Sequence, residues 1–155
     1  MLLKHSVNLK KVSLESLDIN NETFESLSKS SSINTLNLAM CRGITADGII
    51  LLLNNLKSLK SLNISWTDLD RESVTLICQY LTPKIKKINL SGCKTTLLDS
   101  DIEKLTQNCP KLTHLDISDA QSLTTLSIEY IASNLICLEH LTSSRCYSIQ
   151  PSSYL

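Results

Sequence analysis

The 155-residue chain is poor in aromatic residues, glycine and proline, and it has no net charge. Aromatic residues make up 4% of it, so the core must be built from aliphatic side chains. Its three glycines are too few for a glycine-rich loop that cradles phosphate. Because 15 Lys+Arg balance 15 Asp+Glu, no net field attracts nucleic acid or an anionic membrane. We expect neither as a partner.

Long apolar runs and catalytic motifs are also lacking. No segment reaches the roughly 18 continuous apolar residues of a membrane span, and the start of the chain has no signal-peptide run. The six cysteines form no Cys-x-x-Cys pair and no cysteine–histidine pair at zinc-ligand spacing. No Ser/His/Asp order or Gly-x-Ser-x-Gly is present. We expect structural thiols in a reducing compartment, no cofactor and no enzymatic activity.

What the chain does contain is one phrase, L-x-x-L-x-L-x-x-C with variants, repeated six times. Its first positions fall at residues 9, 33, 59, 85, 112 and 138, which are 24 to 27 residues apart. This pattern and period are typical of leucine-rich repeats. The predicted fold is an α/β solenoid over residues 1–155, a curved right-handed superhelix of about six strand–helix repeats. A parallel sheet is expected on its concave side and helices on its convex side.

Within each repeat, the L-x-L segment predicts a short strand whose side chains alternate between inside and outside. The expected inward pairs are Leu36 and Leu38, Leu62 and Ile64, Ile88 and Leu90, and Leu115 and Ile117. Helix-period stretches lie at 24–27, 45–53, 73–81, 102–105 and 128–135. Candidate helix N-caps are Thr45, Asp70, Ser100 and Thr125.

Both ends of the chain resemble interior repeats. A solenoid needs terminal caps with a polar outer face, yet the first repeat starts after eight residues and only a short tail follows the last one. The sixth repeat also has Ser143 where an inward leucine is expected. We therefore expect residues 1–155 to be an incomplete domain.

Equivalent positions of a solenoid form columns on its surface. One expected outward column is polar: Asn37, Asn63, Asn89, Asp116 and Thr142. A second is small and is expected to leave the concave floor open to a partner: Ala39, Ser65, Ser91, Ser118 and Ser144. A third places His114 and His140 on neighbouring strands. With no third ligand in view, we interpret these histidines as surface residues and predict no metal site.

The column at the strand exits is different, and it contains Met40, Trp66, Gly92, Asp119 and Arg145. Tryptophan and arginine are enriched among interface hot spots, and exposed apolar groups rimmed by charge mark docking sites. We therefore favour partner binding at this column. The competing interpretation is structural: Trp66 folds back over the repeat edge, and Asp119 pairs with Arg145.

Several phrases resemble a known family in order and spacing. They are L-x-x-L-N-I-S-W at 59–66, I-N-L-S-G at 88–92, N-C-P-K-L-T-H-L-D-I-S-D at 108–119 and S-R-C-Y-S-I-Q-P at 144–151. Together they resemble the leucine-rich repeats of the F-box/leucine-rich-repeat family typified by S-phase kinase-associated protein 2. The resemblance extends over essentially the whole chain, without the F-box.

The resemblance implies a substrate-recognition module of an SCF (Skp1–cullin–F-box) ubiquitin ligase, active on phosphorylated cell-cycle regulators in nucleus and cytoplasm. In that family the repeats hold a small cyclin-dependent-kinase regulatory subunit, and the two together capture the phosphorylated substrate. Skp1 is an implied partner only of a longer form that has an F-box. A leucine-rich scaffold or regulator unconnected to ubiquitin is the alternative.

By resemblance, the family's docking residues fall on Trp66, Lys94, Asp119 and Arg145. Lys94 stands where well-known members carry arginine. This keeps the positive charge but loses the bidentate fork of a guanidinium group.

Overall fold

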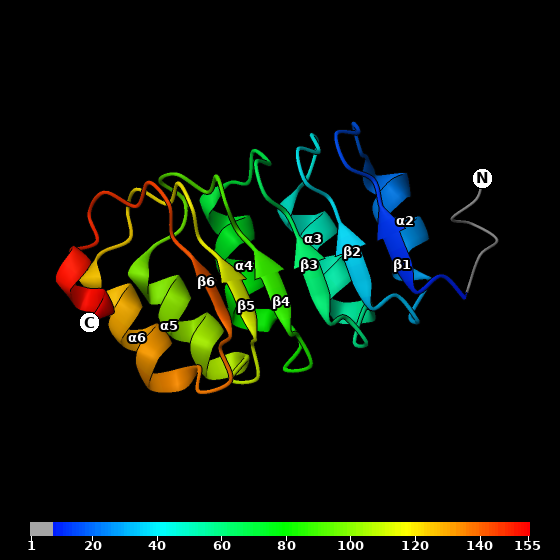
Figure 1. Ribbon diagram of the computed structural model, residues 1–155. Coiled ribbons are helices and arrows are strands. Elements are labelled where there is room, and N and C mark those ends of the chain that lie inside the picture. Colours follow the sequence, from blue (N-terminus) through cyan, green and yellow to red (C-terminus); the bar gives the residue numbers. More distant parts are fainter. Residues whose placement is uncertain (1–7) are drawn as a thin grey trace.

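Strands and helices alternate along the chain in the computed structural model, which describes residues 8–155 (Figure 1). The elements are β1 (Lys11–Ser13), α2 (Asn21–Ser28), β2 (Thr35–Asn37), α3 (Ala46–Asn55), β3 (Ser61–Asn63), α4 (Arg71–Tyr80), β4 (Lys87–Asn89), α5 (Asp99–Asn108), β5 (His114–Asp116), α6 (Thr125–Asn134), β6 (His140–Thr142) and a short 3₁₀ helix, Pro151–Tyr154. Among these residues no helix is both long and apolar enough to cross a membrane.

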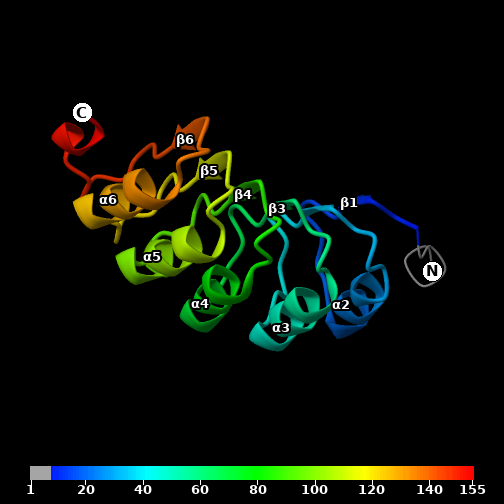
Figure 2. The same ribbon diagram turned by 90° about the horizontal axis from the view of Figure 1, so that it is seen from below.

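The strands form one parallel sheet in the order β1 to β6, and each strand residue pairs with its equivalent in the next repeat. Leu36, Leu62, Ile88 and Leu115 thus stand in one row. Figure 2 shows the strands along the inside of an arc and the helices along the outside. Helices are wider than the roughly 4.8 Å spacing of strands, so stacking them side by side curves the sheet.

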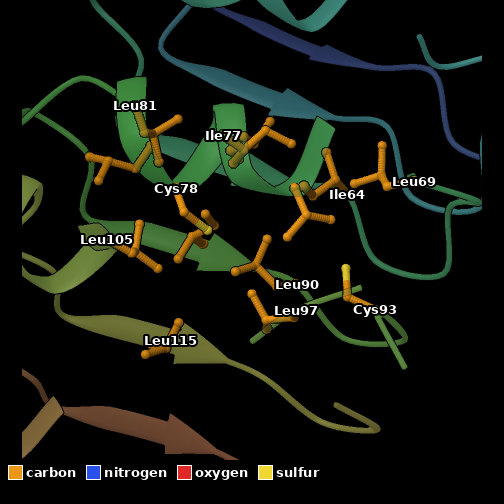
Figure 3. Packing of buried hydrophobic residues seen from close by; sticks show 14 of the residues in the cluster. Ile64, Leu69, Ile77, Cys78, Leu81, Leu90, Cys93, Leu97, Leu105 and Leu115 are labelled. Carbon is orange, nitrogen blue, oxygen red and sulfur yellow. The ribbon is translucent and has the colours of Figure 1, made fainter. Parts of the chain in front are cut away.

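The core is aliphatic and runs unbroken from repeat to repeat. All eight inward strand residues expected from the repeat pattern are buried, with at most 5% of their surface exposed. Figure 3 shows Ile77 and Cys78 of α4 in this core together with Leu90, which follows β4, and Leu105 of α5. At the sixth repeat, Ser143 replaces leucine, and its hydroxyl lies 2.7 Å from that of Tyr154.

Two of the four expected helix caps are confirmed. The Thr45 hydroxyl accepts a hydrogen bond from the Gly48 amide at 3.2 Å, and the Asp70 carboxylate accepts one from the Ser73 amide at 2.8 Å. Each satisfies an amide that the first helical turn leaves without a partner.

The other two expected caps are wrong. Ser100 lies inside α5, because that helix is capped at Leu98, whose amide donates to the Asp101 carboxylate at 2.9 Å. The cap of α6 is Thr124, one residue before Thr125. A pattern of residue types favours Ser or Thr at a cap. It does not show that an aspartate three residues later reaches back, nor which of two adjacent threonines has extended backbone.

Five of the six cysteines lie where buried structural thiols are expected. All six are free, and all except Cys137 are buried. The Cys41 thiol lies 2.9 Å from the Leu14 carbonyl oxygen, and so joins the second repeat to the first. Burial raises the pKa of Cys93 and of Cys109 to about 12, so both remain protonated thiols.

Candidate protein-interaction site

An acidic or amide side chain at the end of each central strand builds the turn that leaves the sheet. Its Oδ1 accepts a hydrogen bond of 2.8–3.0 Å from the amide two residues on. The acceptors are Asn37, Asn63, Asn89 and Asp116. The outward polar column therefore holds backbone geometry, a role that the sequence analysis missed. An Asn or Asp followed by a small residue is the signal for such a turn.

The column of small residues is mostly buried, which corrects the expectation that it opens the concave floor. Ala39, Ser65, Ser91 and Ser118 are all buried. The turn packs each of them against the neighbouring repeat, and the Ser118 hydroxyl accepts a hydrogen bond from the Ser144 amide at 3.2 Å. Small side chains suit these buried turn positions.

The next residue of each turn has a left-handed backbone. The φ angles are 57° at Met40 and Trp66, 86° at Gly92, 62° at Asp119 and 60° at Arg145. Only glycine takes this conformation freely, whereas another L-residue there costs about 1–2 kcal/mol. The repeat imposes the turn, but it does not impose a tryptophan or an arginine. Strained positions that keep bulky side chains point to a function.

Backbone hydrogen bonds join the residues of this column into one continuous row. The amides of Met40, Trp66, Gly92 and Asp119 each donate to a carbonyl oxygen of the next repeat at 2.8–2.9 Å. Their side chains consequently follow one another along the edge of the sheet. We call the row Met40, Trp66, Gly92, Asp119 and Arg145, together with the adjacent Lys94, the exit rim.

Trp66 lies across Gly92 of the following repeat. A Cβ atom at Gly92 would stand 2.9 Å from Trp66 Cδ2, so glycine is needed for this contact as well as for its φ angle. Despite this contact, Trp66 is 47% exposed to solvent. Trp66, Gly92 and Lys94 line one shallow hollow of the surface. The structural interpretation is thus right about the folding back of Trp66, while about half of the residue still faces solvent.

Asp119 and Arg145 form a two-pronged ion pair. Arg145 Nε donates to Oδ1 and Nη2 donates to Oδ2, each at 2.6 Å. The hydrogen bond from Arg145 lowers the pKa of Asp119, and the positive charges of Arg145 and Lys94 contribute in the same direction. The Arg145 side chain stays 55% exposed. The pairing that the structural interpretation expected is therefore present, with its guanidinium edge open to solvent.

The structure brings the four predicted docking residues onto one rim. Trp66 and Lys94 share a hollow, and Asp119 and Arg145 share an ion pair. Lys94 lies between the two, since its carbonyl oxygen accepts the Gln121 amide at 2.8 Å and its charge acts on Asp119. Their role in binding remains a prediction.

The histidine row contains more than was expected. The rings of His114 and His140 have centroids 4.2 Å apart and planes inclined by 42°. No third ligand was foreseen, yet Glu139 brings a carboxylate so that the ligand atoms of all three residues lie within 4.8 Å of one another. Burial and the neighbouring Lys87 ammonium lower the pKa of His114, which keeps its imidazole neutral near pH 7.

Comparison with known protein families identifies the family of this domain. The sequence matches the SKP2 LRR domain over residues 1–155. The chain belongs to this family. It is 30% identical over 122 residues to the F-box protein SKIP19 of Arabidopsis thaliana, a match that spans 78% of this chain and 39% of that protein. The chain thus spans about two-fifths of the length of that relative.

The fold of a solved structure agrees with the predicted one. The tropomodulin C-terminal domain of Caenorhabditis elegans superposes with a TM-score of 0.57 at 18% identity, over 88% of each chain. The leucine-rich repeat-containing protein LegL7 of Legionella pneumophila gives 0.49 at 14% identity, over 88% of this chain and 56% of that one. The family resemblance and the solenoid fold are confirmed. This is a leucine-rich-repeat protein-interaction domain related to F-box proteins, of a type that is usually non-catalytic.

Proposed function

We propose that this domain recognises substrates for an SCF ubiquitin ligase, and that the exit rim is its docking surface. By family resemblance the partners are a cyclin-dependent-kinase regulatory subunit and a phosphorylated cell-cycle regulator, in nucleus and cytoplasm, with Skp1 added in a longer form. The observation that carries the proposal is Trp66, half exposed at a strained backbone position and flanked by Lys94 on the same rim.

Trp66 has the properties of a pre-organised anchor. Its backbone is tied to the next repeat by the 2.8 Å hydrogen bond to Ser91, and its indole rests on Gly92. A side chain that is already ordered loses little conformational entropy when a partner covers it. Burial of the exposed part of the indole then contributes binding free energy at a small entropic cost, which is typical of a hot spot.

The charged part of the rim complements this anchor. Arg145 uses two nitrogens on Asp119, and its other N–H donors remain for a carboxylate or phosphate of the partner. Lys94 is exposed and adds a second positive charge. A partner with an apolar cleft bordered by acidic groups matches this arrangement.

A binding titration tests the proposal, and the exposed aromatic residues of the chain supply a matched control. Trp66→Ala is expected to weaken binding of the regulatory subunit by about 2 kcal/mol or more, roughly thirtyfold, in calorimetry. Tyr80→Ala removes another exposed aromatic residue, 57% exposed on the convex helix α4, and should leave affinity unchanged. Far-UV circular dichroism checks that both variants fold.

Equal affinities of the two variants would contradict the rim as the docking surface. Trp66 is also the only tryptophan of the chain, so its emission reports directly on whether a partner covers the site. An in-frame F-box encoded upstream in the gene supports the ligase function. Its absence there favours a scaffold unconnected to ubiquitin.

A further inference from the structure

A second row of chemically active side chains lies on the concave face, away from the exit rim. Lys87, His114 and His140 hold the same register on β4, β5 and β6. Neighbouring strands lie about 4.8 Å apart, so the side chains of such a row are within reach of one another. Glu139 directly precedes His140 and brings its carboxylate to the two imidazoles.

The hydrogen bonds around His114 determine which of its nitrogens carries the proton and which one has the lone pair. Lys87 Nζ lies 3.2 Å from Nε2, and an ammonium group can only donate, so Nε2 is the acceptor. Nδ1 lies 2.9 Å from Thr113 Oγ1, whose own proton goes to the Lys86 carbonyl oxygen at 3.1 Å. Nδ1 must therefore carry the proton and donate it to Thr113.

This arrangement is the one found in metal-binding histidines. Such a histidine usually donates one N–H to an oxygen, which fixes the tautomer, and offers the other nitrogen to the ion. In His114 the donated proton is on Nδ1 and the offered atom is Nε2, which points to the Lys87 ammonium. A cation already sits where a metal ion would bind.

We propose that His114, Glu139 and His140 form a binding site for a divalent transition-metal ion of the zinc class. Two imidazoles and one carboxylate are a ligand set that suits zinc, whereas magnesium and calcium prefer oxygen ligands. The three ligand atoms lie within 4.8 Å of one another, and tetrahedral zinc needs about 3.4 Å. Glu139 and His140 are exposed, so their side chains have room to rotate toward this spacing.

The site has an open side. His114 and His140 line the hollow of the concave face together with Lys87, Asn89 and Asp116. A three-ligand zinc site keeps its fourth position for water or another ligand. In this domain that position faces the open hollow of the concave face.

Substitution of Lys87 tests the proposal, because it should strengthen metal binding. Such an increase is not expected if His114 is an ordinary surface histidine. Its ammonium and a metal ion compete for the same lone pair of His114. Lys87→Met removes the competitor without touching a ligand, so it should tighten binding several-fold. A variant that strengthens binding is hard to attribute to loss of folding.

The experiment is a titration of the full, untagged, reduced chain with Zn²⁺ by calorimetry and with Co²⁺ by visible absorption. The exposed thiol of Cys137 is a rival ligand, so Cys137→Ser is the background for all variants. One ion per chain is expected to bind. His140→Gln and Glu139→Gln should each weaken binding at least about tenfold, while His5→Gln, the third histidine of the chain, should not change it.

Three results would overturn the proposal. The first is loss of binding in the Cys137→Ser background alone, which would assign the metal to a thiol. The second is unchanged affinity in both His140→Gln and Glu139→Gln with folding intact by circular dichroism. The third is absence of saturable binding in Lys87→Met, where competition is removed.

Discussion

Two arginine–aspartate pairs of the same length join neighbouring repeats, and they lie in different environments. Arg71 and Asp101 pair at 2.6 Å between the first turns of α4 and α5, while Arg145 and Asp119 pair at 2.6 Å on the exit rim. The Asp101 side chain is 1% exposed and that of Asp119 is 12% exposed. The two pairs therefore have the same N–O distance but differ in how far solvent reaches their carboxylates.

The difference lies in what else each carboxylate holds. Asp101 also accepts the Leu98 amide at 2.9 Å, so it caps α5 in addition to binding the preceding repeat through Arg71. Asp119 has Arg145 as its side-chain partner, and this arginine is 55% exposed although the carboxylate itself is largely covered. Asp101 thus joins two repeats from a buried position, whereas the rim pair leaves its guanidinium group open to solvent.

Removal of the buried Asp101 carboxylate should have the largest effect on stability. Asp101→Ala leaves the Leu98 amide and the Arg71 guanidinium without their acceptor, and we expect a loss of about 3 kcal/mol in the free energy of unfolding. Urea denaturation followed by circular dichroism measures it. A loss as small as that of Asp119→Asn, with the same denaturant dependence, would remove the distinction between the two pairs.

The next largest effect on stability is expected from acid, through Asp99 in the first turn of α5. Burial acts to raise the pKa of Asp99, but hydrogen bonds from Ser127 and Thr124 outweigh it and lower the pKa. A pKa lowered by folding stabilises above the unfolded value near 3.9, and that contribution is lost as pH falls through the folded value. Between pH 5 and pH 3, we expect a loss below about 1 kcal/mol, since solvent screens the group.

Asp99→Asn provides the matched measurement for this pH effect. The asparagine keeps an acceptor oxygen but does not titrate, so its urea midpoint should vary less between pH 5 and pH 3 than that of the parent chain. An identical pH dependence in both proteins would show that Asp99 does not contribute.

Relieving backbone strain on the rim should have a smaller effect of the opposite sign. Met40 has a φ of 57° and is exposed, so Met40→Gly removes the left-handed cost while losing little packing. We expect stabilisation of about 0.5 kcal/mol, because the added freedom of glycine in the unfolded chain offsets part of the gain. Thermal unfolding detects the change. A lower Tm would show that Met40 contributes more packing than its exposure indicates.

The smallest stability effect is expected at the rim ion pair itself. Asp119→Asn keeps an acceptor for Arg145 and a residue type that tolerates a positive φ, so the urea midpoint should stay unchanged. Affinity for the regulatory subunit should nevertheless fall, because Arg145 loses the charge that holds its orientation. A large drop in stability with intact binding would reverse the roles assigned to the two pairs.

The repeat pattern was sufficient to predict the strands, the inward residues and every residue of the exit rim except Lys94. The physical reason is that each repeat contacts only its neighbours. Aligning Trp66 with Asp119 in the sequence therefore places them in one row in space. Family motifs then added Lys94, which belongs to no repeat column and which the structure places in the hollow beside Trp66.

Contacts that depend on the path of a turn could be read only from the tertiary structure. Ser65, Ser91, the cap at Leu98 and Glu139 all lie outside the strands, where alternation does not set the direction of a side chain. There, side-chain direction follows from local φ and ψ and from the neighbouring repeat, not from a period in the sequence. Leucine spacing by itself determined the solenoid and its rows. Packing between repeats decided which polar residues of those rows became buried, paired or left open to a ligand.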